Sequence, residues 1–226
     1  MPTHPFAETG FRIVLDVFSG DECDRLLESL AESSLVRSRA GARHVLSNPV
    51  VREAALDSRL IGLASEALAA PAIPYRATLF DKSPGANWLV AWHQDRTLPI
   101  KERFEGEGWG PWSIKAGILH AQAPAEALGR VVALRVHLDP STAENGPLRV
   151  IPGSHRLGVL RVAAVANLVE QSTPVTCLVP RGGILVMRPL LVHSSSKATS
   201  DQPRRVLHIE YTSSLTLGPG QEIATI

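Results

Sequence analysis

Three histidines are each followed, two residues later, by a carboxylate: His93–Asp95, His137–Asp139 and His208–Glu210. Residues i and i+2 share one face of a β-strand, so each pair could present an imidazole and a carboxylate to one metal ion. The motif alone has little specificity, because eight histidines and 22 acidic residues in 226 give about 0.8 such pairs by chance. The surrounding sequence must therefore distinguish among the three pairs.

The context favours His93 and Asp95 as a metal site. They end an apolar run, 88–93, and precede a segment rich in glycine, proline and aromatic residues, so their side chains should face open space. The four tryptophans lie within 25 residues around His93, which fits either a hydrophobic minicore or the aromatic wall of a small-molecule pocket. His208 and Glu210 lie inside an apolar strand, where a buried group or a cross-strand ion pair is the simpler interpretation.

A third ligand must come from elsewhere, and His193 closes the apolar run 184–192 just before a polar loop. Two histidines and one carboxylate on one face of a metal leave three positions open, which suits Fe(II) with a bidentate co-substrate and O₂. Arg204, eleven residues after His193, could bind a distant carboxylate through two parallel hydrogen bonds, and Ser195 could donate one more. Arg205 is the alternative, but neighbouring side chains of a strand point to opposite faces, so only one arginine can serve.

The elements that position these residues can be predicted along the chain. An apolar run at 11–14 predicts a strand, and Ser19 with Glu22 matches a helical capping box followed by a buried stripe that includes Cys23. Asn48 and Pro49 predict the start of a second helix that runs to about residue 71, with Leu56 on its apolar seam. We expect these helices, within about 19–70, to support a sheet.

Beyond residue 74 the chain changes to short runs of β-branched and aliphatic residues separated by Gly and Pro turns. The predicted strands are 75–81, 88–93, 114–120, 131–138, 148–151, 176–179, 184–187 and 206–211. This pattern is typical of an antiparallel sandwich or jelly roll. We therefore expect one domain over 1–226, mainly β, with its core at about 75–212.

The composition of the chain limits the classes of partner that the protein is expected to bind. A net charge of +1 gives no electrostatic reason to bind nucleic acid, and the most apolar stretch is interrupted by Arg188 and Pro189, which excludes a membrane helix. The two cysteines cannot form a disulfide framework, and the first ten residues lack the pattern of a secretory signal. We expect a soluble cytoplasmic protein with a small-molecule substrate, as a monomer or a dimer.

Three motifs together resemble the phytanoyl-CoA hydroxylase family of Fe(II)/2-oxoglutarate-dependent oxygenases. They are Trp92-His-Gln-Asp95, Asn145-Gly-Pro-Leu-Arg-Val-Ile-Pro-Gly-Ser-His155, and His193-x-Ser195 followed by Arg204, within a resemblance over about 10–211. The resemblance implies a double-stranded β-helix in which His93, Asp95 and His193 bind iron. It also implies that Arg204 and Ser195 hold the far carboxylate of 2-oxoglutarate, with O₂ as the second co-substrate.

The implied reaction is hydroxylation, or another oxidation, of a C–H bond in a small molecule, with release of succinate and CO₂. Because Asp95 is present, the resemblance favours hydroxylation over halogenation. The segment 96–122 should form the substrate wall and lid, with Trp109, Trp112, Lys115 and His120 as candidate substrate residues. Two alternatives stay open: a metal-dependent cupin enzyme that does not use 2-oxoglutarate, and a jelly-roll binding protein without turnover.

Overall fold

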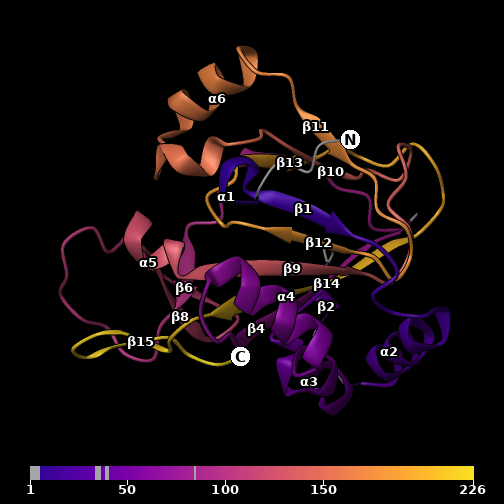
Figure 1. Ribbon diagram of the computed structural model, residues 1–226, viewed down its shortest axis with the longest axis horizontal. Helices are drawn as coiled ribbons and strands as arrows, with labels where there is room; N and C mark the ends of the chain where they lie inside the picture. Colours follow the sequence, from indigo (N-terminus) through magenta and orange to yellow (C-terminus); the bar gives the residue numbers. More distant parts are fainter. Residues whose placement is uncertain (1–5, 34–36, 39–40, 84) are drawn as a thin grey trace.

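The alternating sequence pattern folds into two main antiparallel sheets and two smaller ones in the computed structural model, which describes residues 6–33, 37–38, 41–83 and 85–226 (Figure 1). In sheet order, the large sheet consists of β1 (Phe11–Val14), β12 (Ile184–Met187), β9 (Val131–His137), β14 (Arg204–Thr212), β4 (Ile73–Lys82), β3 (Gly41–Arg43) and β2 (Arg37–Ser38). The small sheet consists of β11 (Val175–Cys177), β10 (Leu148–Val150), β13 (His193–Ser195) and β5 (Val90–His93). The predicted jelly roll is confirmed.

Residue parity divides the large sheet into two faces. On β14 the odd residues Leu207, Ile209 and Tyr211 pack with the helices in one hydrophobic cluster. The even residues, including Arg204, His208 and Glu210, point the other way because side chains alternate along a strand. The interior between the sheets is therefore apolar near β10 and β12 but charged along β4 and β14.

Three helices cover the outer face of the large sheet: α2 (Gly20–Glu32), α3 (Pro49–Ala55) and α4 (Ser58–Leu68) (Figure 1). The predicted capping box is confirmed, since Ser19 and Glu22 each accept a backbone hydrogen bond from the other. Cys23 is fully buried in the same cluster. By packing against its outer face, these helices hold the large sheet in place, and the inner face of that sheet carries the charged residues.

The prediction of a single helix from Asn48 to about residue 71 is wrong, because the chain forms two helices there. The side chain of Asp57 accepts a hydrogen bond from the backbone of Arg59 and caps α4 as a new helix. Leu56, predicted on the apolar seam, ends α3 instead and is 57% exposed. The N-cap at Asp57 therefore starts a new helix even though the apolar pattern continues without a break.

The strand predicted over 114–120 is also divided. β7 (Trp112–Lys115) and β8 (Ile118–Gln122) form a hairpin whose two central residues, Ala116 and Gly117, have φ of 48° and 81°. Together with β6 (Thr97–Pro99) they form a three-stranded sheet in the order β6-β8-β7. The segment expected as a wall and lid thus has regular structure of its own.

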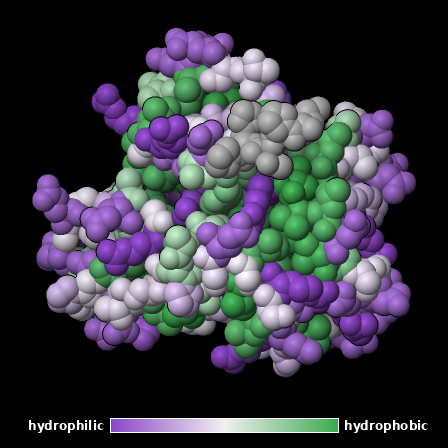
Figure 2. Space-filling model, viewed as in Figure 1, coloured by the Kyte–Doolittle hydropathy of each residue, from purple (hydrophilic) through white to green (hydrophobic). Residues whose placement is uncertain are grey.

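The remaining elements connect and flank the sheets. They are α1 (Phe6–Thr9), the short 3-10 helices η1 (Val45–Ser47) and η2 (Ser154–Leu157), α5 (Ala125–Gly129), α6 (Val162–Glu170), β15 (Thr216–Gly218) and β16 (Gln221–Glu222). No helix among the described residues has the length and apolar character needed to cross a bilayer. Figure 2 shows hydrophilic side chains over much of the viewed face, with one larger hydrophobic area at its right.

Candidate active site

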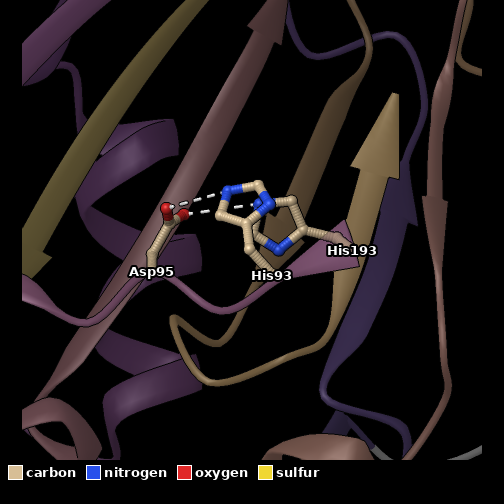
Figure 3. Close-up of side chains that lie close together, drawn as sticks. All are labelled: His93, Asp95 and His193. Atoms are coloured by element: carbon tan, nitrogen blue, oxygen red, sulfur yellow. Dashed lines mark ion pairs between the residues drawn. The ribbon is translucent and has the colours of Figure 1, made fainter. Parts of the chain in front are cut away.

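Three side chains converge where β5 and β13 meet. His93 ends β5, His193 begins β13, and the two lie directly opposite each other in the strand register with ring centroids 4.3 Å apart. Asp95 follows β5 and is anchored by its backbone N–H, which donates to the carbonyl of Pro189 at 2.9 Å. Its carboxylate oxygens lie 3.7 Å from His93 Nε2 and 3.6 Å from His193 Nε2 (Figure 3).

Backbone contacts orient both imidazoles toward this point. Nδ1 of His93 lies 2.8 Å from the carbonyl of Ala91, and Nδ1 of His193 lies 2.8 Å from the carbonyl of Leu191. A carbonyl can only accept, so each Nδ1 carries a proton and each Nε2 faces Asp95, where the neutral ring can bind a metal. A metal-binding histidine is held in this way in proteins generally.

The electrostatics of the cluster suit a cation. Burial lowers the pKa of His193 to about 4, so this imidazole is neutral at pH 7. Burial opposes the ionised form of Asp95, but His193 and His93 outweigh it and lower the pKa of this carboxyl. Among the described residues, this is the single group of three potential ligands with all ligand atoms within 4.8 Å of one another.

The other two histidine and carboxylate pairs have different partners. Nδ1 of His137 donates to the carbonyl of Arg135, and Asp139 accepts two hydrogen bonds from the guanidinium of Arg205, at 2.7 and 2.8 Å. Glu210 lies opposite Arg76 across β4 and β14 and forms an ion pair with it. The cross-strand ion pair that the sequence favours at Glu210 is therefore present in the structure.

Arg204 and Ser195 meet inside the barrel, away from Arg205. Arg204 Nη2 lies 3.3 Å from Ser195 Oγ, and its Nε donates to the carbonyl of Asn145 at 3.2 Å. Ser195 Oγ donates in turn to the carbonyl of Gly146 at 2.8 Å. Arg204 has no ion pair with a described residue, so this buried guanidinium is available to an anion.

Lys82 joins this cluster of side chains, and the sequence did not single it out. It lies directly opposite Arg204 in the register of β4 and β14, and its Nζ is 3.0 Å from Ser195 Oγ. The side chain is buried, and burial together with Arg204 lowers its pKa to about 8. Two buried cations facing each other are unfavourable unless an anion binds between them. One feature of the sequence could have pointed to Lys82. It and Arg76 are both even-numbered residues of the same strand, so their side chains lie on the same face.

Gly146 packs closely against this cluster. Its φ is +69°, and a Cβ there would lie 2.4 Å from the carbonyl oxygen of Ser196 and 2.8 Å from Lys82 Nζ. A side chain at this position would therefore displace the ammonium group.

A cavity of about 250 Å³ is lined by two residues of the cluster, His93 and Asp95. Its lining residues are Arg43, His44, Arg76, Thr78, Phe80, His93, Asp95, Thr97, Lys115, His120, His208 and Glu210. Two of the predicted substrate residues, Lys115 and His120, are among them. Trp109 and Trp112 are not, because their rings pack edge-on against Phe104 at 5.0 and 5.3 Å in a separate hydrophobic cluster.

Fold and site together define a jelly-roll protein with a two-histidine, one-carboxylate metal centre. This donor set, with three open coordination positions, fits Fe(II) in 2-oxoglutarate-dependent oxygenases. The chain belongs to the phytanoyl-CoA dioxygenase family, whose family model matches residues 6–206.

A similar characterised protein is L-proline trans-4-hydroxylase of Streptomyces griseoviridis, which is 30% identical over 180 residues. The matched region covers 67% of this chain and 59% of that hydroxylase, so the chain spans less than two thirds of its relative.

Solved structures show the same fold. EctD from S. alaskensis with bound Fe is 22% identical, with a TM-score of 0.68 over 92% of this chain and 74% of that one. HygX from Streptomyces hygroscopicus with nickel and 2-oxoglutarate bound is 18% identical, with a TM-score of 0.67 over 97% of this chain and 94% of that one.

Proposed function

We propose that this protein is an Fe(II)- and 2-oxoglutarate-dependent dioxygenase that hydroxylates, or otherwise oxidises, a C–H bond of a small molecule. The proposal rests on the presence of two binding sites inside one barrel. The cluster of His93, Asp95 and His193 can hold a metal, and the buried cations Lys82 and Arg204 can hold a carboxylate. An oxygenase of this family needs both sites, one for iron and one for its dicarboxylate co-substrate.

His93, Asp95 and His193 would hold the iron through two Nε2 atoms and one carboxylate oxygen. When bound, Fe(II) supplies the activation of O₂ that couples decarboxylation of 2-oxoglutarate to substrate oxidation. The protein contributes placement: the carbonyls of Ala91 and Leu191 fix the two imidazoles, so the ligands are oriented before the metal arrives.

Arg204, Ser195 and Lys82 would bind the far carboxylate of 2-oxoglutarate. The planar guanidinium of Arg204 matches two carboxylate oxygens, and Lys82 adds a point charge. The Ser195 hydroxyl, which donates to the carbonyl of Gly146 in the structure, would turn to donate to the carboxylate. An anion at this position would offset two buried cations that lack carboxylate partners among the described side chains. Co-substrate binding would thus relieve an electrostatic penalty built into the ligand-free pocket.

The substrate that we propose is a free small molecule, and the similarity to L-proline trans-4-hydroxylase makes L-proline the first to test. We place the protein in the cytoplasm as a single oxygenase domain over 1–226. A reducing compartment suits its two cysteines, Cys23 and Cys177, which are buried and unpaired.

The decisive experiment follows succinate. Protein loaded anaerobically with Fe(II) and 2-oxoglutarate is exposed to O₂ with and without candidate substrates, and succinate is quantified. We expect slow succinate formation without substrate, faster formation with the correct one, and neither in the Asp95→Ala variant. Metal binding without any 2-oxoglutarate consumption would instead indicate a cupin enzyme of another class, and binding of neither would indicate a protein without turnover.

A further inference from the structure

The cavity beside the metal cluster has more positive than negative side chains in its lining. Three cations line the cavity, Arg43, Arg76 and Lys115, against two carboxylates, Asp95 and Glu210. A divalent metal at the histidines would add two further positive charges. The cavity is therefore set up to receive an anion.

The two carboxylates already have partners. Arg76 binds Glu210 through both Nε and Nη2, the latter at 2.6 Å, and Tyr75 donates its hydroxyl to Glu210 at 3.2 Å. Asp95 faces the two imidazoles. Neither carboxylate is left for Arg43 or Lys115.

Arg43 and Lys115 have no ion pair with any residue in the described part of the chain. Lys115 Nζ donates to a neutral group, the Thr97 hydroxyl, at 3.0 Å, and Thr97 is two residues beyond Asp95. Arg43 lies opposite Thr78 in the register of β3 and β4, and Thr78 lies opposite His208. Residues directly opposite share a face of the sheet, so Arg43 lies on the cavity face and lines the cavity while being exposed to solvent.

The other polar groups at this end are neutral imidazoles. His44 and His120 stack with ring centroids 6.5 Å apart and planes 16° apart. Burial lowers the pKa of His120 to about 4, and its Nδ1 is used by the carbonyl of Ile118. These rings can form a wall and offer hydrogen bonds, but they cannot neutralise Arg43 and Lys115.

The co-substrate does not account for this excess, because its near carboxylate would offset only one of the two charges of the metal. Its far carboxylate has a separate receptor at Lys82 and Arg204, and neither of these residues lines the cavity. We propose that the substrate is a small carboxylic acid, an amino acid included, whose carboxylate binds between Arg43 and Lys115. This inference rests on the proposed function and adds the class of substrate to it.

The cavity volume agrees with a small ligand. About 250 Å³ lies below the roughly 300–1,000 Å³ of pockets that hold drug-sized molecules. An acid of this size, held by its carboxylate between Arg43 and Lys115, would lie in the same cavity as His93 and Asp95.

The test measures binding without turnover. Four acids (L-proline, L-valine, hexanoate and benzoate) and their four carboxamides are titrated calorimetrically into anaerobic protein loaded with Fe(II) and 2-oxoglutarate. We expect at least one acid to bind, about tenfold or more tightly than its amide, because the amide cannot form the charge-assisted pair. Lys115→Met and Arg43→Gln should each reduce the affinity for that acid about tenfold and leave the affinity for 2-oxoglutarate unchanged.

Lys101→Met is the matched control, because Lys101 pairs with Glu222 on the surface and does not line the cavity. Equal binding of acids and amides, or failure of all four acids to bind while 2-oxoglutarate binds normally, overturns the inference. Unchanged acid affinity in both the Lys115 and Arg43 variants overturns it as well. Loss of 2-oxoglutarate binding in the wild type would instead refute the proposed function.

Discussion

Replacing Lys82 with methionine should stabilise the ligand-free protein and weaken its binding of 2-oxoglutarate. The side chain is 1% exposed, and a fall of its pKa from 10.5 to about 8 corresponds to about 3 kcal/mol of lost stabilisation of the charged form. Methionine keeps the aliphatic stem but removes the charge and two hydrogen bonds, to Ser195 and Ser196, of about 1 kcal/mol each. The net gain in the free energy of unfolding should be about 1 kcal/mol.

The effect on 2-oxoglutarate has the opposite sign. Removing a hydrogen bond to a charged group costs about 1.5–3 kcal/mol, so the dissociation constant should rise between about tenfold and a hundredfold. A substitution that improves the empty protein and impairs the bound one indicates a residue selected for its ligand.

The same group predicts two pH dependences. The folded-state pKa of Lys82, about 8, is below the unfolded value, so the folded state holds fewer protons between pH 8 and about 10.5. The stability of the ligand-free protein should gain from Lys82 as pH rises through that window. A bound carboxylate favours protonated Lys82, so 2-oxoglutarate affinity should fall as pH rises above 8, and this dependence should disappear in Lys82→Met.

Urea unfolding of the metal-free protein from pH 7 to 10.5 measures the two effects on stability, and anaerobic calorimetry of the Fe(II) protein from pH 7 to 9.5 measures the two effects on 2-oxoglutarate binding. Lys101→Met again serves as the surface control. A Lys82→Met protein that is clearly less stable than the wild type, yet binds 2-oxoglutarate equally well, would show that Lys82 supports the barrel and does not bind the co-substrate.

Three further outcomes are expected. Arg204→Lys keeps the charge but loses the planar fork, so calorimetry should show 2-oxoglutarate binding about tenfold weaker or worse, whereas Arg205→Lys should bind normally because Arg205 pairs with Asp139. His93→Ala should lose both Fe(II) binding in equilibrium dialysis and succinate formation, while His137→Ala keeps them; the reverse result would move the metal to the other pair. His120→Ala should bind Fe(II) and 2-oxoglutarate normally but oxidise substrate poorly relative to succinate formed, and unchanged coupling would exclude His120 from the substrate wall.

The sequence predicts the jelly roll and the three converging side chains well because both depend on local signals. Alternating apolar residues identify the strands, and His93, Asp95 and His193 lie where apolar runs end. The strand β13 is not predicted, since His-Ser-Ser has no apolar alternation and becomes a strand through its pairing with β10 and β5. Tertiary pairing overrides local propensity there.

Residues that matter through long-range juxtaposition could not be predicted. Lys82 is an ordinary lysine until β14 places Arg204 opposite it, and Arg43 belongs to a three-residue strand that the apolar pattern does not mark. The tryptophans show the converse. Their clustering near His93 fitted a pocket wall as well as a minicore. In the structure Trp109 and Trp112 both pack against Phe104, and neither lines the cavity beside His93.

The opposed positions of His93 and His193 have a consequence for dynamics. β5 lies at the edge of the small sheet and, among the described strands, pairs only with β13, so few backbone hydrogen bonds hold it in place. An ion shared by the two imidazoles would act as a cross-link between these strands, and its binding energy would add directly to their pairing. Amide hydrogens of β5 should therefore exchange with solvent much faster in the metal-free protein than in the loaded one, while those of β9 and β14 in the large sheet exchange at similar rates in both.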